Sequence, residues 1–301
     1  MTASAPRVVV IGGANVDVIA RPHVAAVAAT SNPGRVTVTP GGVGRNIAEG
    51  LARLGTRTDL VATVGSDAHG DLVVSGSAAA GVGVDHVRRV LAATGTYVAL
   101  LDEGGEMVSA VSDMAATAQL GPADVAPTAD LVAVADLLVL DGNLSEEALR
   151  AAWDLGVASG VRVVIDPVSV PKAVTVGRLL GPDRPLYLLS AGSTELVAIA
   201  GLDGAAAAHA RGVELLWERA GSLGSRLSTS RTHHDLEARG ATVVDVTGAG
   251  DAMLAGFCHA HLAGAGPVEA ATYGDAVAAL TVTSRHTVRP DLSDGLVRSL
   301  L

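Results

Sequence analysis

The chain has 301 residues, a formal net charge of −10, 49% hydrophobic residues and one cysteine, Cys258. The acidic balance argues against nucleic acid or an anionic membrane as the main partner. The single cysteine excludes an intrachain disulfide framework and fits a reducing compartment. The first residues lack a secretory signal pattern, and no apolar run of about eighteen residues predicts a membrane span. We therefore expect a soluble, globular cytoplasmic protein.

The lysine content excludes several enzyme classes. Lys172 is the only lysine and follows Pro171, so the chain has no GxxxxGK[ST] phosphate loop. A protein-kinase fold also needs a lysine after a Gly-rich loop. The HExxH and GxSxG signatures of zincins and α/β-hydrolases are missing as well. We interpret Lys172 itself as a solvated loop residue.

Short apolar runs alternate with segments of helical periodicity along the chain. Buried strands are predicted at 8–11, 60–64, 137–140, 161–165 and 186–189. Helices are predicted at 47–54, 68–80, 146–159 and 195–200. Strands and helices that alternate with short connections predict an α/β fold with a largely parallel sheet covered on both faces.

Two stretches break this alternation. Residues 36–39 alternate between apolar and polar, and residues 97–101 and 107–111 flank the sequence DEGGE, which predicts a hairpin. We predict an antiparallel flap inserted into the α/β body. Residues 203–211 and 233–240 show no informative pattern.

The strongest local motif is DVTGAGDAMLAGF at 245–257. A β-branched run at 242–246 leads into it, and its glycines allow amide groups to converge on an anion. The helix that begins there adds a positive dipole end. Asp251, beside this anion site, could accept a proton from an attacking hydroxyl. An ordinary turn with Asp251 as the helix cap gives the same pattern.

A second motif, PGGVGRNIAEGLARLG at 40–55, places three glycines close to Asn46 at a helix start. Its GGxG spacing differs from the GxGxxG dinucleotide fingerprint. A flexible start of a helix explains it equally well. Asp17, in GANVD, follows the first predicted strand, where ligands of open α/β sheets bind. A simple turn aspartate is the alternative.

Together, the GANVD opening, GGVGRNIAEGLARLG and DVTGAGDAMLAGF closely resemble the signatures of the ribokinase-like (PfkB) family of sugar and nucleoside kinases. The resemblance runs over nearly the whole chain. It implies one ribokinase-like domain, 1–301, with a three-layer α/β/α core and a lid from about 18–40 and 96–114. SNPG at 31–34, DPVSVPK, GNLS and TVRPDLS look like the pseudouridine kinase subgroup.

The resemblance also implies roles for individual residues. Asp251 would be the catalytic base, which takes a proton from the substrate's primary hydroxyl as that oxygen attacks the γ-phosphate of ATP. The implied anion hole consists of Gly248, Ala249 and Gly250. The implied substrate-binding residues are Asp17, Asn32, Gly42, Gly44 and Asn46.

Cation and nucleotide positions follow from the same resemblance. Asp245 and Thr247 match positions that hold a monovalent cation such as K⁺ in relatives. Mg²⁺ would arrive with ATP and be held indirectly through Glu195. The implied nucleotide-binding residues are Gly192, Glu195, Ser222 and Gly224.

Two segments depart from the family pattern. In the usual Asn-x-x-Glu motif, Gly192 stands where the asparagine is expected, although Glu195 is kept. The usual Thr-Leu-Gly segment is replaced by GSLGSRLSTS, which Ser222 and Gly224 fit loosely. These departures suggest an altered nucleotide site, with slow turnover or another phosphoryl donor as consequences.

The implied reaction is ATP-dependent phosphorylation of the ribose 5′-hydroxyl of pseudouridine. Two alternatives stay open: another nucleoside or sugar kinase, for ribose or adenosine, and a catalytically impaired homologue that binds a nucleoside. The flap has strand edges that need covering, which predicts a homodimer formed through the lid.

Overall fold

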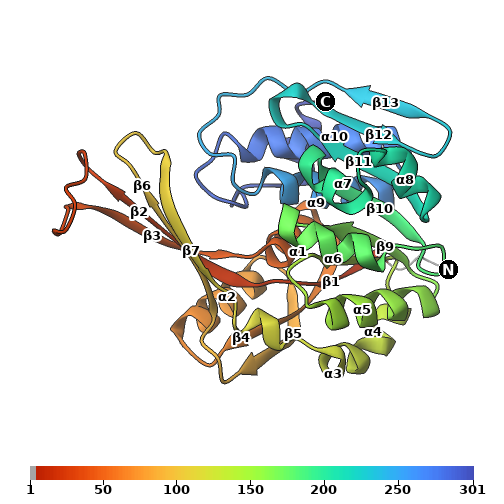
Figure 1. The fold of residues 1–301 in the computed structure, drawn as a ribbon, viewed down its shortest axis with the longest axis horizontal. Coiled ribbons are helices and arrows are strands. Elements are labelled where there is room, and N and C mark those ends of the chain that lie inside the picture. The colour runs from red at the N-terminus through yellow and green to blue at the C-terminus, as the bar shows by residue number, and fades with distance from the viewer. Residues whose placement is uncertain (1–4) are drawn as a thin grey trace.

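Two β-sheets organise the chain in the computed structural model, which describes residues 5–301 (Figure 1). The larger sheet has nine strands, in the order β13 (His233–Leu236), β12 (Ser225–Ser228), β11 (Val213–Arg219), β10 (Leu186–Gly192), β9 (Arg162–Asp166), β8 (Leu137–Asp141), β1 (Arg7–Ile11), β4 (Arg57–Gly65) and β5 (Gly83–Val90). All neighbouring pairs from β11 to β5 are parallel, and β12 and β13 add an antiparallel edge.

Helices cover both faces of this sheet, so the core has three layers (Figure 1). One face packs on α1 (Val43–Leu54), α2 (Ala68–Ala79), α9 (Ala249–Leu262) and α10 (Pro267–Thr281). The other packs on α3 (Pro122–Val125), α4 (Ala129–Ala133), α5 (Glu146–Ala158), α6 (Val170–Leu179), α7 (Ser193–Ala200) and α8 (Gly204–Ala210). The short α11 (Asp294–Arg298) lies near the carboxyl terminus.

Residues 8–11 of β1 show why the sheet is central. Val8 and Val10 belong to one apolar cluster, and Val9 and Ile11 belong to the other. All four side chains are completely buried. Because successive side chains of a strand point to opposite faces, an uninterrupted apolar run needs cover on both sides. Each such side chain stabilises the fold by about 1.5–3 kcal/mol relative to an exposed position.

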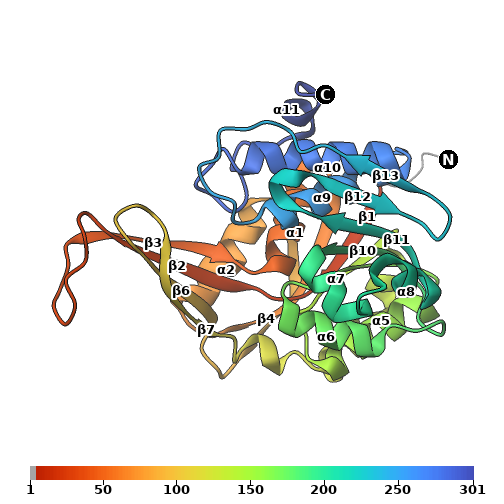
Figure 2. The ribbon, with the colours of Figure 1, turned by 45° about the horizontal axis from the view of Figure 1, so that its top comes forward.

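The smaller sheet projects from one side of the body (Figure 2). Its strands are, in order, β3 (Gly34–Gly41), β2 (Asn15–Pro22), β6 (Gly95–Leu101) and β7 (Met107–Asp113). The outer pairs are antiparallel, whereas the central pair β2–β6 is parallel. A parallel pair needs a long crossover, and here the chain passes through the larger sheet between the two strands.

One face of the smaller sheet presents a row of four valines, in which Val18 packs against the core and the other three are exposed. Val38, Val18, Val98 and Val111 are direct cross-strand neighbours on the four strands. Val38, Val98 and Val111 are exposed. Asp17 precedes Val18 and therefore points to the opposite face.

The structure confirms the predicted α/β class with a mostly parallel larger sheet. The predicted flap has antiparallel outer pairs, but its central pair is parallel. The predicted strands and helices overlap β1, β4, β8, β9, β10 and α1, α2, α5, α7. The uninformative segment 233–240 contains β13, and the β-branched run 242–246 is an exposed loop. Among the described residues, no helix has the length and apolar character needed to cross a membrane.

Candidate active site

The carboxyl ends of the parallel strands gather buried polar side chains at one edge of the larger sheet. Asp141 ends β8, Asp166 ends β9 and Arg219 ends β11. Helices α1 and α9 begin at the same edge and contribute Asn46 and Asp251. Ligands of open α/β sheets bind outside this edge, so the sheet topology alone marks it as a candidate site.

Asp251 is at the centre of this edge. It lies in the first turn of α9 and is only 9% exposed. Its Oδ2 accepts a hydrogen bond of 2.7 Å from Asn46 Nδ2. Burial, together with the negative charge of Asp166, raises the pKa of Asp251 to about 7, against the opposing effects of Asn46 and Arg219. A carboxylate with this pKa is suited to accept a proton near neutral pH.

The turn before Asp251 requires glycine. Gly248 has a left-handed φ of 80°, and a Cβ on it would lie 2.4 Å from the carbonyl oxygen of Thr287. A Cβ on Gly250 would lie 2.5 Å from Nη1 of Arg219. The first N–H groups of a helix have no acceptor inside it and can bind an anion. Of the predicted anion hole, Gly248, Ala249 and Gly250, the Ala249 amide already donates to Val246 O at 3.2 Å. The Gly250 amide and the adjacent amide of Asp251, which was not part of that prediction, remain for an anion.

Asn46 is held in its orientation by Arg45, which the sequence analysis did not single out. The Arg45 guanidinium donates to Asn46 Oδ1 and forms an ion pair with Glu49. With Oδ1 occupied, the amide nitrogen of Asn46 points at Asp251. Arg45 is nearly fully buried, and this burial lowers its pKa, against the opposing effect of Glu49.

Asp141 joins two glycine loops beneath the site. Its carboxylate accepts hydrogen bonds from the amides of Gly13, at 2.8 Å, and Gly44, at 2.7 Å. A Cβ on Gly44 would lie 2.9 Å from Gly12 Cα, and one on Gly42 would lie 2.5 Å from Gly13 O. Gly42 and Gly44 are therefore needed for the close approach of these loops. Burial raises the pKa of Asp141, while its hydrogen bonds lower it.

Asp17 extends from β2 of the smaller sheet. Its Oδ1 accepts a hydrogen bond of 2.8 Å from Asn15 Nδ2. A Cβ on Gly41 would lie 2.3 Å from Asp17 Oδ2, so this carboxylate packs directly against the neighbouring strand. Burial raises the pKa of Asp17, and its neighbours Asn15 and Arg45 oppose that change.

Arg219 forms a charged cluster at the other end of the site. Its Nη1 donates to Asp166 Oδ2 at 2.8 Å, and its Nη2 lies 3.5 Å from Glu195 Oε2. Glu195 Oε2 also accepts from the Gly192 amide at 2.7 Å, where α7 begins. Burial lowers the pKa of Arg219, but the negative neighbours Asp166 and Glu195 outweigh it and raise the pKa overall.

The remaining predicted nucleotide residues lie in the turn that follows β11. Ser222 is exposed in the short helical turn Gly221–Leu223. Gly224 is buried and has a φ of 94°, and a Cβ there would lie 2.2 Å from Leu236 O. The structure thus gives Gly224 a backbone role in the turn and leaves Ser222 facing solvent.

Three predicted residues lie outside the buried cluster. Asn32 is exposed in the loop between β2 and β3, and its Oδ1 accepts from Val27 N of the same loop at 2.8 Å. Asp245 and Thr247 lie in the loop before α9, where Asp245 Oδ1 accepts from Thr247 N at 2.8 Å. The residues described, 5–301, contain no group of three or more His, Cys, Asp or Glu suited to hold a metal.

The interpretation of Lys172 as a solvated loop residue was wrong. Lys172 lies in the first turn of α6, and its ammonium group donates to Asn143 Oδ1. Burial lowers its pKa, while the nearby Asp141 raises it. The prolines that suggested a loop are compatible with a helix start, because Pro171 occupies the first turn.

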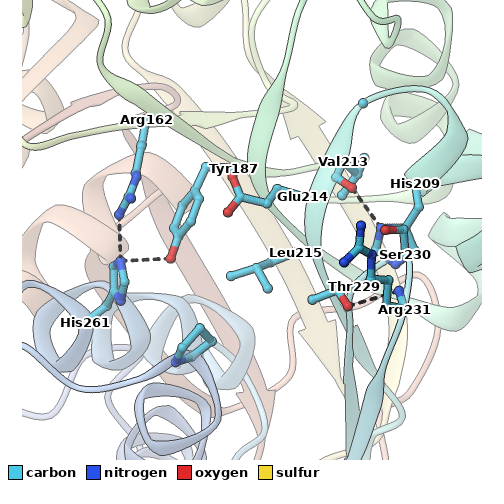
Figure 3. A pocket seen from close by; sticks show the side chains of 12 residues that line it. Arg162, Tyr187, His209, Val213, Glu214, Leu215, Thr229, Ser230, Arg231 and His261 are labelled. Atoms are coloured by element: carbon cyan, nitrogen blue, oxygen red, sulfur yellow. Dashed lines mark hydrogen bonds between the residues drawn. The ribbon is translucent and has the colours of Figure 1, made fainter.

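A cavity of about 630 Å³ lies at the opposite edge of the sheet (Figure 3). Its lining includes Arg162, Tyr187 and Val213, at the amino ends of β9, β10 and β11. None of the residues predicted for the site lines this cavity.

Comparisons with known proteins agree with this geometry. A family model described as pfkB family carbohydrate kinase matches residues 5–294. Pseudouridine kinase of Escherichia coli is 37% identical over 302 aligned residues, covering 98% of this chain and 96% of that protein. Pseudouridine kinase of Arabidopsis thaliana is 30% identical over 193 residues, covering 64% of this chain and 50% of that protein.

A solved structure of ribokinase from Arabidopsis thaliana, complexed with ribose and ATP, superimposes with a TM-score of 0.83. It is 25% identical, and the match covers 98% of each chain. Sequence and fold thus agree over almost the full length of the protein. The chain belongs to the pfkB family of carbohydrate kinases and is a phosphotransferase with an alcohol group as acceptor.

Proposed function

We propose that the protein is an ATP-dependent pseudouridine kinase, which phosphorylates the ribose 5′-hydroxyl of pseudouridine. The observation that supports pseudouridine as the substrate is the 37% identity to the Escherichia coli pseudouridine kinase over 98% of the chain. The buried Asp251 supports the chemistry, because a nucleoside hydroxyl must lose a proton when it attacks phosphorus.

The transfer step uses groups already in place. The 5′-oxygen forms a bond to the γ-phosphorus of ATP, the bond from that phosphorus to the bridging oxygen breaks, and ADP leaves with the electron pair. The hydroxyl proton passes to Asp251. Asn46 holds Asp251 Oδ2 at 2.7 Å and so fixes the direction of the accepting carboxylate.

In this proposal, the positive end of the α9 helix dipole and the free amides of its first turn stabilise the transferred phosphoryl group. The first turn of α9 presents the N–H groups of Gly250 and Asp251. Phosphoryl transfer depends mainly on positioning and on electrostatic stabilisation, so such donors are the main requirement. Glu195 would hold Mg²⁺ indirectly, through water, and the ion would neutralise phosphate charge on ATP.

The sugar lies between the two sheets in this proposal. Asp17 accepts hydrogen bonds from ribose hydroxyls, and Asn32 adds a contact if the lid moves toward the body. Closure of the lid would exclude water and limit wasteful hydrolysis of ATP. Asp245 and Thr247 offer oxygens to a monovalent cation such as K⁺ beside the anion hole.

The test is a phosphorylation assay with Mg²⁺, K⁺ and ATP across pseudouridine, uridine, adenosine, cytidine and ribose. We expect pseudouridine to react with the highest kcat/KM, and Asp251→Asn to lose that activity. The matched control is Asp154→Asn, an exposed aspartate paired with Arg184, which should remain fully active. Preference for another acceptor would contradict pseudouridine as the substrate but would still support kinase activity.

A binding measurement distinguishes an active kinase from a catalytically impaired homologue that only binds a nucleoside. If no acceptor reacts while pseudouridine still raises the melting temperature, the protein is a nucleoside-binding homologue without kinase activity. If neither nucleoside nor nucleotide binds, the proposed function fails altogether.

We also propose that the protein forms a homodimer through the valine row of the smaller sheet. Val111 is 68% exposed there, and contiguous exposed apolar side chains typically mark an interaction surface. Sedimentation should give a dimer for the wild type and a monomer for Val111→Asp. Val134→Asp is the control, because Val134 is 63% exposed at the end of α4. A wild-type monomer at micromolar concentration would contradict the dimer.

A further inference from the structure

Arg219 connects three elements that surround the phosphate end of the site. It ends β11, and its guanidinium contacts Asp166 at the end of β9 and Glu195 in the first turn of α7. The same guanidinium lies against Gly250 in the first turn of α9, where a Cβ would come within 2.5 Å of Nη1. Its side chain is 15% exposed.

The position of this charge is unusual. The N-terminus of a helix carries partial positive charge, so a cation beside it is disfavoured unless an anion compensates. Asp166 at the end of β9 and Glu195 in the first turn of α7 compensate part of the cost. An anion bound at the first turn of α9 would contact the guanidinium and the helix amides together.

Arg219 also has N–H groups that are available to bind a ligand. A guanidinium has five N–H groups. Within the described residues only Nη1 makes a hydrogen bond, to Asp166, whereas Nη2 lies 3.5 Å from Glu195 in a longer ion pair. A phosphate offers several acceptor oxygens, and arginine binds phosphate through two parallel N–H groups.

The neighbouring strand explains why this long side chain fits. Gly192 is the direct cross-strand partner of Arg219, and it has no side chain. Arg219 and the Gly192 amide share the same acceptor atom, Glu195 Oε2. The polar group at this end of β10 and β11 is therefore supplied by β11 alone.

We propose that Arg219 binds the terminal phosphate of the nucleotide donor and stabilises it during transfer, an inference that rests on the proposed kinase function. Asp166 and Glu195 hold the guanidinium in place, and Gly250 allows it to reach the anion hole. The γ-phosphate then lies between Arg219 and the first turn of α9.

The first measurement compares the wild type with Arg219→Gln and Arg219→Lys in the phosphorylation assay. We expect Arg219→Gln to lower kcat by about 10²–10³-fold, the usual loss for one donor to a developing negative charge. The KM for pseudouridine should change by less than about twofold, since the guanidinium does not touch the nucleoside. Arg219→Lys keeps the charge without the paired donors and should fall between the two.

The second measurement does not depend on turnover. Calorimetry compares binding of AMP-PNP, which carries the terminal phosphate, with binding of ADP, which lacks only that phosphate. The wild type should prefer AMP-PNP, and Arg219→Gln should lose that preference. Arg226→Gln is the matched control, because Arg226 lies on the adjacent strand β12 and is exposed; it should behave like the wild type in both measurements.

The outcomes separate the two proposals. Equal preference for AMP-PNP in wild type and Arg219→Gln, or no preference in the wild type, would overturn the role of Arg219. Tighter nucleotide binding or faster turnover in Arg219→Gln would also overturn it, because Arg219 would then block the site. If the wild type phosphorylates no acceptor but prefers AMP-PNP, and Arg219→Gln lacks that preference, the role of Arg219 in phosphate binding is supported. The proposed kinase function is then contradicted. Arg219→Lys keeps the test decisive if Arg219→Gln does not fold.

Discussion

The two edges of the nine-stranded sheet both hold polar clusters, but the clusters differ in how their charges are balanced. At the amino edge, Tyr187 and Arg162 both donate to His261 Nε2, at 2.8 and 3.2 Å (Figure 3). His261 Nδ1 forms a hydrogen bond of 3.2 Å with the carbonyl oxygen of Ala265. Both ring nitrogens of His261 therefore have a polar partner within the protein. Burial raises the pKa of Tyr187 to about 12, so the phenol stays neutral.

At the carboxyl edge the charges do not balance within the protein. Asp251 is buried with Asp166 nearby, and its carboxylate is ionised only in part at neutral pH. The cavity of about 630 Å³ lies at the amino edge, where the polar groups satisfy each other. Under the proposed assignment of the active site to the carboxyl edge, uneven charge identifies the site better than cavity volume does, because stored electrostatic cost is typical of functional sites.

The largest expected effect is on activity, at the carboxyl edge. Asp251→Asn removes the proton acceptor while keeping the size of the side chain. A general base contributes about 10²–10⁴-fold, so kcat should fall by that factor. Steady-state assays with saturating pseudouridine would measure it. Full activity in this variant would show that the two edges do not differ in chemistry.

The same substitution should stabilise the fold at high pH. Asp251 has a pKa of about 7 in the folded state against 3.8 for its ordinary value. The folded state therefore binds the proton more tightly, and stability is lost as pH rises from about 4 to about 7. The difference corresponds to at most about 4 kcal/mol. In urea unfolding, the free energy of unfolding of Asp251→Asn should increase relative to that of the wild type between pH 5 and pH 8. A gap that stays constant across this range would contradict the burial effect.

The pH profile of the wild type sharpens the assignment of Asp251. Protonation of a base with a pKa of about 7 should lower kcat/KM about tenfold per pH unit below that value. The measurement is kcat/KM for pseudouridine from pH 5 to 9. A flat profile down to pH 5 would mean that the free carboxylate has an ordinary pKa. The thermal stability of the protein across the same range serves as the control.

The smallest effect belongs to the amino edge. Tyr187→Phe removes the hydroxyl that donates to His261 and should cost about 1 kcal/mol of folding free energy. Because His261 keeps Arg162 as a donor, the packing of the rings should persist. Kinase activity should not change. A loss of kcat larger than about threefold would show that the amino edge takes part in the reaction.

The sequence motifs predicted the centre of the site but not its surroundings. Asp251 and Asn46 come from separate motifs, and the structure joins them by a 2.7 Å hydrogen bond. Asp141 and Asp166 could have been found, because each directly follows a buried strand, as VLD and VID. Arg219 has no such signal, since its partners come from β9 and α7, far away in the chain.

The fold was easier to predict than its edges. Apolar runs such as 8–11 identify the central strands because both faces of those strands are covered. Three of the four residues of β13 are exposed and two are histidines, so its sequence shows no strand pattern. Asn32 lies in an exposed loop and forms hydrogen bonds with the backbone of Val27. The substrate contact that the family resemblance implies for it stays a prediction.

The parallel pairing of β2 with β6 sets an order of events during folding. The β2–β3 and β6–β7 pairs join strands separated by short connections and can form early, as local hairpins. Asn15, however, pairs with Gly95, so the two hairpins meet only after α1, β4, α2 and β5 have been placed. Closing so long a loop is slow compared with forming a hairpin. On a ribosome, the smaller sheet would therefore be completed only after β6 has emerged, and until then β2 would present an open edge to chaperones.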